Sequence, residues 1–175
     1  MSTISDQIIA HLESIGVRHV FTVSGGGSIF LCDALARAKT MKYVCCHHEQ
    51  AAGYAAEAYA RLTGLGVTLV TSGPGGTNAV SACAASWLDN VPHLFLSGQV
   101  FLAQTIRGRK GLRQCGVQEI NIIDIVRPIT KYAVMCLAPS QVKAQLKRAI
   151  KHATTGRPGP VWLDIPADIQ NAKLD

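Results

Sequence analysis

The sequence is poor in charged and aromatic side chains. Only 16% of its 175 residues are Asp, Glu, Lys or Arg and only 6% are Phe, Trp or Tyr, whereas 48% are hydrophobic. A disordered chain would combine low hydrophobicity with a high density of charge. A chain of this length buries roughly 70% of its unfolded surface on folding. We therefore expect one folded domain with a large core.

Long apolar runs are also missing. No run approaches the roughly 18 apolar residues of a membrane-spanning helix. The first residues, Met1 to Asp6, have neither the apolar region of a secretory signal nor the Arg-rich character of a transit peptide. We expect a cytoplasmic protein that does not bind a membrane.

Metal-binding patterns are absent as well. The six cysteines form no Cys-x-x-Cys pair and have no histidine at the spacing of a zinc site. The sequence His47-His48-Glu49 lacks a second histidine four residues after His48, because Ala52 stands there. We expect no metal site in this chain, and most of the cysteines to be buried thiols.

Acidic residues are fewer than basic ones, 11 against 17, which gives a net charge of +6. Part of this charge lies on the polar side of a predicted amphipathic helix, at Lys143, Lys147, Arg148 and Lys151, which is typical of a solvated helix. Another part lies in one loop, at Arg107, Arg109, Lys110 and Arg113. That loop either contacts another domain, a subunit or an anionic ligand, or is simply exposed. We do not expect nucleic acid as a partner.

Apolar strand patterns alternate with helical patterns along the chain. A helix starts at Thr3-Ile4-Ser5-Asp6 and ends at Gly16. The strand patterns lie near 19–23, 42–46, 67–71, 93–97, 131–135 and 161–165. This order predicts an α/β fold with a parallel six-stranded sheet and helices on both faces.

Two junctions place polar groups at the carboxyl edge of this sheet, where α/β proteins bind ligands. Glu49 follows the apolar strand 41–46 and opens an alanine-rich helix, 50–62, although the helix dipole alone would also favour a glutamate there. The turn 72–78 contains three glycines, which let a flat ring or a phosphate approach the backbone. We expect Thr77 or Asn78 to cap the next helix, from Ala79 to Leu88.

Six segments in this order and spacing resemble the N-terminal, pyrimidine-binding domain of thiamine-diphosphate enzymes, closest to the acetolactate synthase group. The resemblance runs from Ile4 to Asp168. The segments are Val17–Gly27, His48-Glu49-Gln50, Thr71–Asn78, Ser97-Gly98-Gln99, Gln118-Glu119 and Gly156–Val161.

The resemblance implies roles for individual residues. Glu49 matches the glutamate that hydrogen-bonds the pyrimidine nitrogen N1′ and so promotes loss of the thiazolium C2 proton, and Gln118 matches a glutamine that faces cofactor and substrate. Pro74 and Asn78 match positions that line the pyrimidine pocket, with Thr71 at the same strand end. The loop that covers the pyrimidine from the partner subunit corresponds to Val23, Ser24, Gly25 and Gly26. For the glycines, the demands of a tight turn are an alternative explanation.

The resemblance also implies cofactors and partners. Thiamine diphosphate is the expected cofactor, with Mg²⁺ held by a diphosphate-binding domain whose Gly-Asp-Gly motif does not occur in this sequence. We therefore expect residues 1–175 to be a single pyrimidine-binding domain, a fragment of a longer three-domain enzyme, and inactive alone. A separate subunit of a split decarboxylase and a non-catalytic binding module are alternatives. Whether the complete enzyme binds FAD stays open.

The sequence departs from the acetolactate synthase pattern near the substrate. Val23 and Ser24 replace an aromatic residue and a proline, and Cys115-Gly116-Val117 replaces Asp-Ala-Phe. The missing phenylalanine predicts a wider pocket, so the substrate is a small 2-oxo acid that need not be pyruvate, and either carboligation or decarboxylation fits. The small side chains of helix 50–62 match a dimer interface in related enzymes, which predicts a homodimer.

Overall fold

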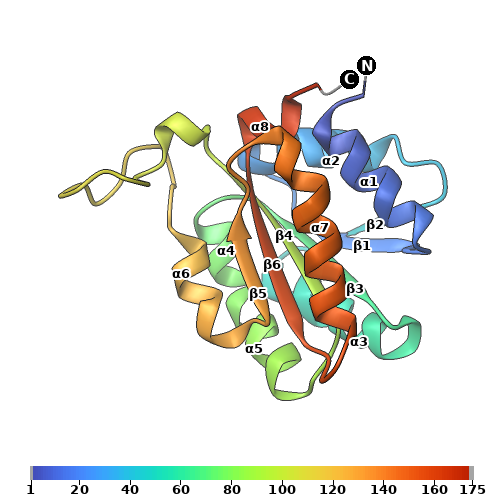
Figure 1. Cartoon of the computed structure of the whole chain (residues 1–175). Helices are drawn as coiled ribbons and strands as arrows, with labels where there is room; N and C mark the ends of the chain where they lie inside the picture. Colours follow the sequence, from blue (N-terminus) through green and yellow to red (C-terminus); the bar gives the residue numbers. More distant parts are fainter. Residues whose placement is uncertain (1, 174–175) are drawn as a thin grey trace.

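The computed structural model describes residues 2–173 of the chain. Its centre is a six-stranded sheet in which all neighbouring strands are parallel, in the order β2-β1-β3-β4-β6-β5 (Figure 1). The strands are β1 (His19–Thr22), β2 (Lys42–Cys45), β3 (Gly66–Val70), β4 (His93–Gln99), β5 (Tyr132–Met135) and β6 (Pro160–Pro166). The predicted α/β fold and the six predicted strands are confirmed.

Helices cover both faces of the sheet, as predicted. One face carries α1 (Ile4–Ser14), α2 (Ile29–Ala36), α7 (Pro139–Thr154) and α8 (Ala167–Asn171), and the other carries α3 (Glu49–Thr63), α4 (Pro74–Asn78), α5 (Val80–Leu88) and α6 (Ile122–Val126). Short 3-10 turns are η1 (Gly26–Ser28), η2 (Leu102–Gln104) and η3 (Arg127–Ile129). Each face has its own cluster of buried apolar side chains, so the sheet is a central layer between two cores.

The N-terminal helix begins where the sequence predicts. Thr3 Oγ1 accepts a hydrogen bond from Asp6 N, and Thr3 N donates to Asp6 Oδ2 at 2.9 Å, which forms a capping box. Backbone contacts from Thr3 to Lys173 and from Ile4 N to Ala172 O then place α1 beside α8. Both ends of the described chain therefore meet at the carboxyl end of β6.

The alanine-rich helix α3 packs closely on its own chain. A Cβ atom on Gly53 would lie 2.4 Å from the Cβ of Ala82 in α5, and one on Gly66 in β3 would lie 2.2 Å from the carbonyl oxygen of Ala56. Neither position has room for a larger side chain. Small residues therefore let α3 approach α5 and β3, which fixes the helix that begins with Glu49.

Three stacked rings cross the centre of the sheet. The His93 and Phe95 ring centroids are 3.9 Å apart, and those of Phe95 and Trp162 are 4.7 Å apart. Both His93 ring nitrogens are bonded, to Thr68 Oγ1 at 2.7 Å and Ser86 Oγ at 2.9 Å. Complete burial lowers the pKa of His93 to about 3, so the ring is neutral at pH 7.

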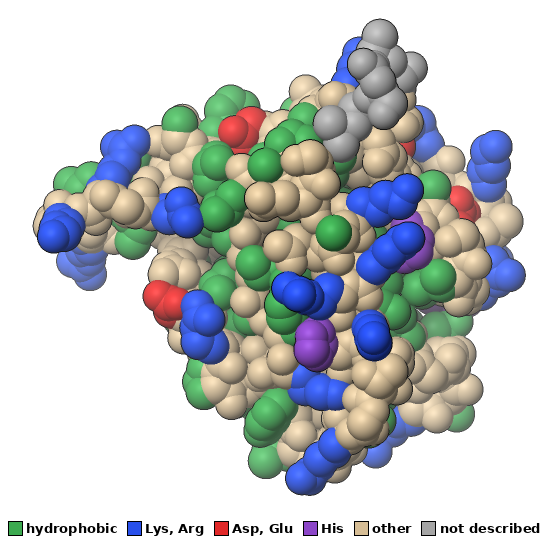
Figure 2. All heavy atoms as spheres, in the orientation of Figure 1, with side chains coloured by type: hydrophobic (Ala, Val, Ile, Leu, Met, Phe, Trp, Pro, Cys, Tyr) green, Lys and Arg blue, Asp and Glu red, His purple; other side chains and the backbone are tan. Residues whose placement is uncertain are grey.

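Two surface expectations have different outcomes. The amphipathic helix is confirmed, because α7 buries Val142, Leu146 and Ala149 while its basic residues cover the exposed side visible in Figure 2. The expectation of mostly buried cysteines is wrong, because only Cys83 and Cys136 of the six are buried. Small side chains at strand ends and in loops stay accessible whatever their polarity.

None of the helices within residues 2–173 has the length and hydropathy needed to cross a bilayer.

Candidate functional site

Glu49 is buried at the carboxyl edge of the sheet. It is the first residue of α3, close after the end of β2, and only 9% of it is exposed. His48 caps the helix, because its Nδ1 accepts a hydrogen bond from Gln50 N at 3.1 Å. A carboxylate at a helix N-terminus is stabilised by the helix dipole, which helps to hold Glu49 at a site largely shielded from water.

Asn78 is the hydrogen-bond partner of Glu49. Its Nδ2 donates to Glu49 Oε2 at 2.9 Å. The expectation that Thr77 or Asn78 caps the helix from Ala79 is wrong, because residues 74–78 form the separate helix α4, and Ala79 precedes α5 without a side-chain cap. The Thr77 hydroxyl instead donates to Pro74 O at 3.2 Å. The helical turn at α4 thereby frees Asn78 to point at the carboxylate.

Thr71 connects Glu49 with the glycine loop, which we define as residues 23–27. Thr71 Oγ1 accepts a hydrogen bond from Gly27 N at 3.0 Å, and a Cβ on Gly25 would lie 2.6 Å from the Thr71 side chain. On its other side, a Cβ on Gly75 would lie 2.6 Å from Thr71 Cγ2 and 3.5 Å from Glu49 Oε1. The glycine loop and Glu49 of the same chain therefore pack around one threonine, whereas the resemblance implies that this loop reaches the pyrimidine from the partner subunit.

A hollow of about 290 Å³ opens beside the glycine loop. Among the described residues its lining has no charged side chain and combines apolar with amide and hydroxyl groups. The lining consists of Gly26, Gly27, Ser72, Gln99, Val100, Phe101, Gln104, Val117, Gln118 and Ala167. A Cβ on Gly26 would meet no atom within 4 Å, so this residue faces open space. The hollow has room for a small polar ligand.

Gln118 is held in an unusual backbone conformation. Its φ is +58°, which few residues other than glycine adopt. Gly73 lies against it with a φ of +56°, and a Cβ on Gly73 would lie 2.1 Å from the Gln118 carbonyl oxygen. Strained backbone of this kind persists only where the surrounding structure enforces it. The turn 72–74 thus sets the position of Gln118.

The residues after Gln118 are anchored from two directions. Glu119 accepts hydrogen bonds from Ile106 N at 2.6 Å and Cys115 N at 3.0 Å. Gln99 Nε2 donates to Ile120 O at 3.0 Å and to Asp164 Oδ2 at 3.1 Å. Complete burial raises the pKa of Asp164 to about 7, although bonds from Ser97 and Gln99 oppose the shift.

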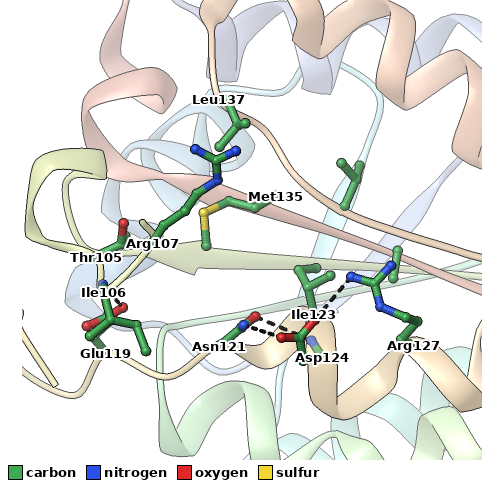
Figure 3. Close-up of a pocket in the computed structure, with 12 residues that line it drawn as sticks. Thr105, Ile106, Arg107, Glu119, Asn121, Ile123, Asp124, Arg127, Met135 and Leu137 are labelled. Carbon is green, nitrogen blue, oxygen red and sulfur yellow. Dashed lines mark hydrogen bonds and ion pairs between the residues drawn. The ribbon is translucent and has the colours of Figure 1, made fainter. Parts of the chain in front are cut away.

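A second hollow, of about 330 Å³, lies on the other side of this segment, between the loop at 105–107, α6 and the free edge of β5 (Figure 3). It is lined by Glu119, whereas the first hollow is lined by Gln118, so these adjacent residues separate the two. Arg107 extends toward Met135 and Leu137 in Figure 3, and Arg127 pairs with Asp124 at 3.1 Å. None of the predicted site residues lines this second hollow.

The predicted basic loop projects from the body of the domain (Figure 1). Arg109 is bound within the loop, since its Nη2 donates to Ala103 O at 2.6 Å and its Nη1 to Cys115 Sγ at 3.4 Å. Lys110 and Arg113 are exposed near the tip. The structure leaves both interpretations of this loop open, a contact surface or an exposed loop.

The structure brings most of the predicted site residues to one edge. Glu49, Asn78, Thr71 and Gly25 lie together, and Gly26 and Gln118 line the first hollow. Of the three other predicted site residues, Val23 is half-buried, and Ser24 and Pro74 are exposed. The Ser24 hydroxyl makes no hydrogen bond within residues 2–173.

Some lining residues were not predicted. Phe101 is outside every predicted segment, whereas Ser72 and Gln99 lie in the segments Thr71–Asn78 and Ser97-Gly98-Gln99 without a predicted role of their own. Those two segments are the available signal, because a polar residue at the end of a buried strand lies at the ligand-binding edge.

Comparison with known proteins agrees with this geometry. Residues 2–124 match the family model described as thiamine pyrophosphate enzyme, N-terminal TPP binding domain. The chain is 41% identical to an acetolactate synthase of Arthrospira platensis over 172 residues, which are 96% of this chain and 28% of that protein. It is 41% identical to the acetolactate synthase large subunit of Corynebacterium glutamicum, over 96% of this chain and 26% of that protein. It is also 41% identical to the chloroplastic acetolactate synthase 2 of Zea mays, over 95% of this chain and 25% of that protein.

The chain therefore spans about a quarter of the length of the relatives it matches. The matched family segment contains Glu49, Asn78, the glycine loop and Gln118, which are the residues that the fold gathers at the carboxyl edge of the sheet. This chain belongs to the thiamine pyrophosphate enzyme family, as its N-terminal TPP-binding domain.

Proposed function

We propose that this chain supplies the pyrimidine-binding half of the active site of a thiamine-diphosphate-dependent carboligase or decarboxylase that acts on 2-oxo acids, similar to acetolactate synthase. The observation that carries the proposal is the buried Glu49 carboxylate, held by Asn78 at the ligand-binding edge of a parallel sheet. Burial of a carboxylate is costly unless it is paired, and within residues 2–173 no basic side chain pairs with Glu49, which supports a role for this side chain in binding a ligand.

The residues at this edge fit an aminopyrimidine ring. The ring is flat, and Gly26 offers it open space, while Gly25 and Gly75 leave just enough room for Thr71 to pack between them. Glu49 offers the carboxyl group that would hold the ring nitrogen N1′, and Asn78 fixes the direction of that carboxyl. When bound, thiamine diphosphate supplies the nucleophilic carbon for the carbonyl chemistry of 2-oxo acids. The part of this chain is to orient the ring, exclude water and hold a proton at Glu49.

The complete enzyme needs further domains under this proposal. Residues 1–175 form one pyrimidine-binding domain of a longer three-domain protein, since the relatives are about four times as long. The middle and diphosphate-binding domains lie outside this chain, and the latter holds Mg²⁺ and the diphosphate. The chain alone is inactive, and the complete enzyme works in the cytoplasm.

The substrate binds in the first hollow in this proposal. Gln118 and Gln104 line it with amide groups that make no side-chain hydrogen bond within residues 2–173, and Val117, 82% exposed, stands where related enzymes have phenylalanine. A smaller side chain at this wall leaves space for a 2-oxo acid larger than pyruvate. Carboligation and decarboxylation both use the same site.

A second copy of the domain completes the assembly. The face of α3 that points away from the sheet exposes the small residues Ala51 and Ala58, which allow close helix contact, beside the large apolar side chains of Tyr54 and Leu62. We propose a homodimer through this face. Light scattering of the complete enzyme should give a dimeric mass, and Ala58→Arg should shift it toward the monomer. A monomeric wild type at tens of micromolar would contradict the dimer.

The test of the function uses Glu49→Gln in the complete enzyme. This change keeps the size and the bond-accepting oxygen of the side chain but removes its ability to take a proton. Turnover of 2-oxo acids with thiamine diphosphate and Mg²⁺ should fall by about 100-fold or more, as for a lost general acid or base. Glu57→Gln, in the same helix and paired with Arg61, is the matched control. Near wild-type turnover in Glu49→Gln would refute the proposal.

A further inference from the structure

We propose that Gln170, in α8, is a positioning residue that holds the glycine loop against Thr71 and thereby fixes the surroundings of Glu49. The inference rests on the proposed function, because it concerns the same cofactor edge. Gln170 lies outside the matched family segment and makes no contact with the first hollow. Its effect on the site therefore passes through other residues.

Both donors of the Gln170 amide are used on backbone carbonyls. Gln170 is completely buried, and its Nε2 donates to Gly27 O and to Ile165 O, each at 2.7 Å. Ile165 belongs to β6, an interior strand of the sheet, whereas Gly27 belongs to the glycine loop, 143 positions away from Gln170 in the sequence. One side chain therefore fastens the loop to the rigid sheet.

Gly27 is also held by contacts on its other side. Its N–H donates to Thr71 Oγ1 at 3.0 Å, and its carbonyl group packs so closely on Gly98 that a Cβ there would lie 2.1 Å from Gly27 O. Thr71 in turn lies against Gly75 next to Glu49. Two hydrogen bonds and one van der Waals contact thus connect Gln170 to the site of the carboxylate.

The helix that carries Gln170 is itself fixed. Ser5 Oγ donates to Gln170 O at 3.0 Å, which ties α8 to α1. Two residues earlier, Asp168 Oδ1 accepts a hydrogen bond from Leu102 N at 3.0 Å, and Ala167 lines the first hollow. The helix α8 therefore braces the glycine loop and the start of the segment that leads to Gln118, which are two walls of the same hollow.

Apolar packing alone does not explain an amide at this position. Gln170 Oε1 is buried and has no hydrogen-bond partner among the described residues, which lowers stability. An apolar residue would avoid this cost but would leave Gly27 O and Ile165 O without the donor that now binds them. What the amide adds is the pair of N–H groups, one of which holds Gly27.

The test compares two variants of the complete enzyme. Gln170→Met keeps the side-chain volume but removes both donors. Thr130→Ala is the control, because it removes a buried hydrogen bond, from Thr130 Oγ1 to Val126 O at 2.9 Å, that contacts neither α8 nor the glycine loop. In the cofactor-free protein, Gln170→Met should speed amide hydrogen exchange of residues 23–28, and Thr130→Ala should not. The dissociation constant for thiamine diphosphate should rise about tenfold in Gln170→Met, as expected for one or two lost hydrogen bonds. It should stay within about twofold of wild type in Thr130→Ala, even where the two melting temperatures fall equally.

Unchanged loop exchange in Gln170→Met, or equal cofactor affinity in the two variants, would overturn the inference. If Gln170→Met does not fold, Gln170→Asn replaces it, because the shorter amide cannot reach both carbonyls; wild-type exchange and affinity in that variant would overturn the inference too. Failure of the wild-type enzyme to bind thiamine diphosphate would instead refute the proposed function, while the exchange result would still report on the loop.

Discussion

Asn78 Nδ2 donates a hydrogen bond of 2.9 Å to Glu49 Oε2 and joins the end of α4 to the start of α3, 29 positions away in the sequence. The bond occupies one carboxylate oxygen, while the other, Oε1, lies beside Gly75 and makes no hydrogen bond within residues 2–173. The orientation of Glu49 is thus set before any ligand arrives, and preorganisation of this kind is what a catalytic carboxylate requires.

Replacing Asn78 should weaken the site more than the fold. We expect Asn78→Ala in the complete enzyme to lower kcat/KM for 2-oxo acids about tenfold, because Glu49 loses its only side-chain partner in the described structure. Thr77→Ala is the control, since the Thr77 hydroxyl bonds only within α4. Steady-state kinetics beside thermal melts would check this, and equal activities of the two variants would contradict it.

Adding a methyl group at Gly73 should displace Gln118. The new Cβ would lie 2.1 Å from the Gln118 carbonyl oxygen, and the positive φ adds backbone strain. We expect Gly73→Ala to reduce the free energy of unfolding by about 2 kcal/mol or more, and to raise KM for substrate. Gly64 also has a positive φ, but a Cβ there would meet open space, so Gly64→Ala should reduce the free energy of unfolding by only about 1 kcal/mol. Urea unfolding would show whether the two costs differ.

Asp164 should make the protein less stable as pH rises from about 4 to 7. Burial raises its pKa to about 7 from an ordinary value of 3.8, so in this range the folded protein keeps a proton that the unfolded chain has released. Stability from this group is present below pH 4 and lost as pH rises through 7. In wild type, this group should lower the free energy of unfolding by up to about 1.4 kcal/mol for each pH unit between pH 4 and 7, and Asp164→Asn should remove that decline. Urea unfolding at several pH values would measure it, and an unchanged slope would rule the effect out.

His93 should change the pH dependence of stability in the direction opposite to Asp164. Burial lowers its pKa to about 3 from 6.5, so its contribution to stability is present above pH 6.5 and lost as pH falls through 3. His93→Gln should therefore flatten the acid side of the stability profile. Since Asp164 opposes it between about pH 4 and 6.5, the wild-type profile should be flatter there than that of Asp164→Asn. A steeper wild-type profile would contradict the assignment.

Filling the first hollow should change substrate preference. Val117 is 82% exposed at its wall, and Val117→Phe would restore the aromatic residue that related enzymes carry. We expect the ratio of kcat/KM for pyruvate to that for bulkier 2-oxo acids to rise about tenfold, as for a pocket that loses space for a few methylene groups. Assays on a panel of 2-oxo acids would check the ratio, and no change would place the substrate elsewhere.

The order of elements could be predicted from the sequence because local signals determine it. Apolar runs such as 67–71 and turn residues such as Gly16 and Gly73 mark the strands and their ends, and the resulting alternation permits few folds. The helix α4 was not predicted, since the glycines and proline of residues 73–76 are typical of a turn. Close packing of Gly75 on Thr71 and of Gly76 on Ile122 accompanies the helical conformation of residues 74–78.

The site could be predicted only in part. Glu49 and Thr71 stand at the ends of elements, where position along the chain already implies position on the sheet. Gln118 lies in the loop between η2 and α6, so only the family resemblance predicts its role. The bond from Asn78 to Glu49 and the hold of Gln170 on Gly27 depend on the path of side chains between distant segments. Sequence periodicity carries no information about such paths, so these partners emerge only from the folded structure.

The stacked rings at the centre of the sheet give the protein an internal optical probe. Trp162 is fully buried and donates to Ser97 Oγ at 2.8 Å, whereas the other tryptophan, Trp87, is 39% exposed. An aqueous quencher such as iodide should reach the indole of Trp87 and spare that of Trp162. Emission that resists quenching therefore reports whether strands β4 and β6 are still joined, and it can follow melting of the interior separately from movements at the surface.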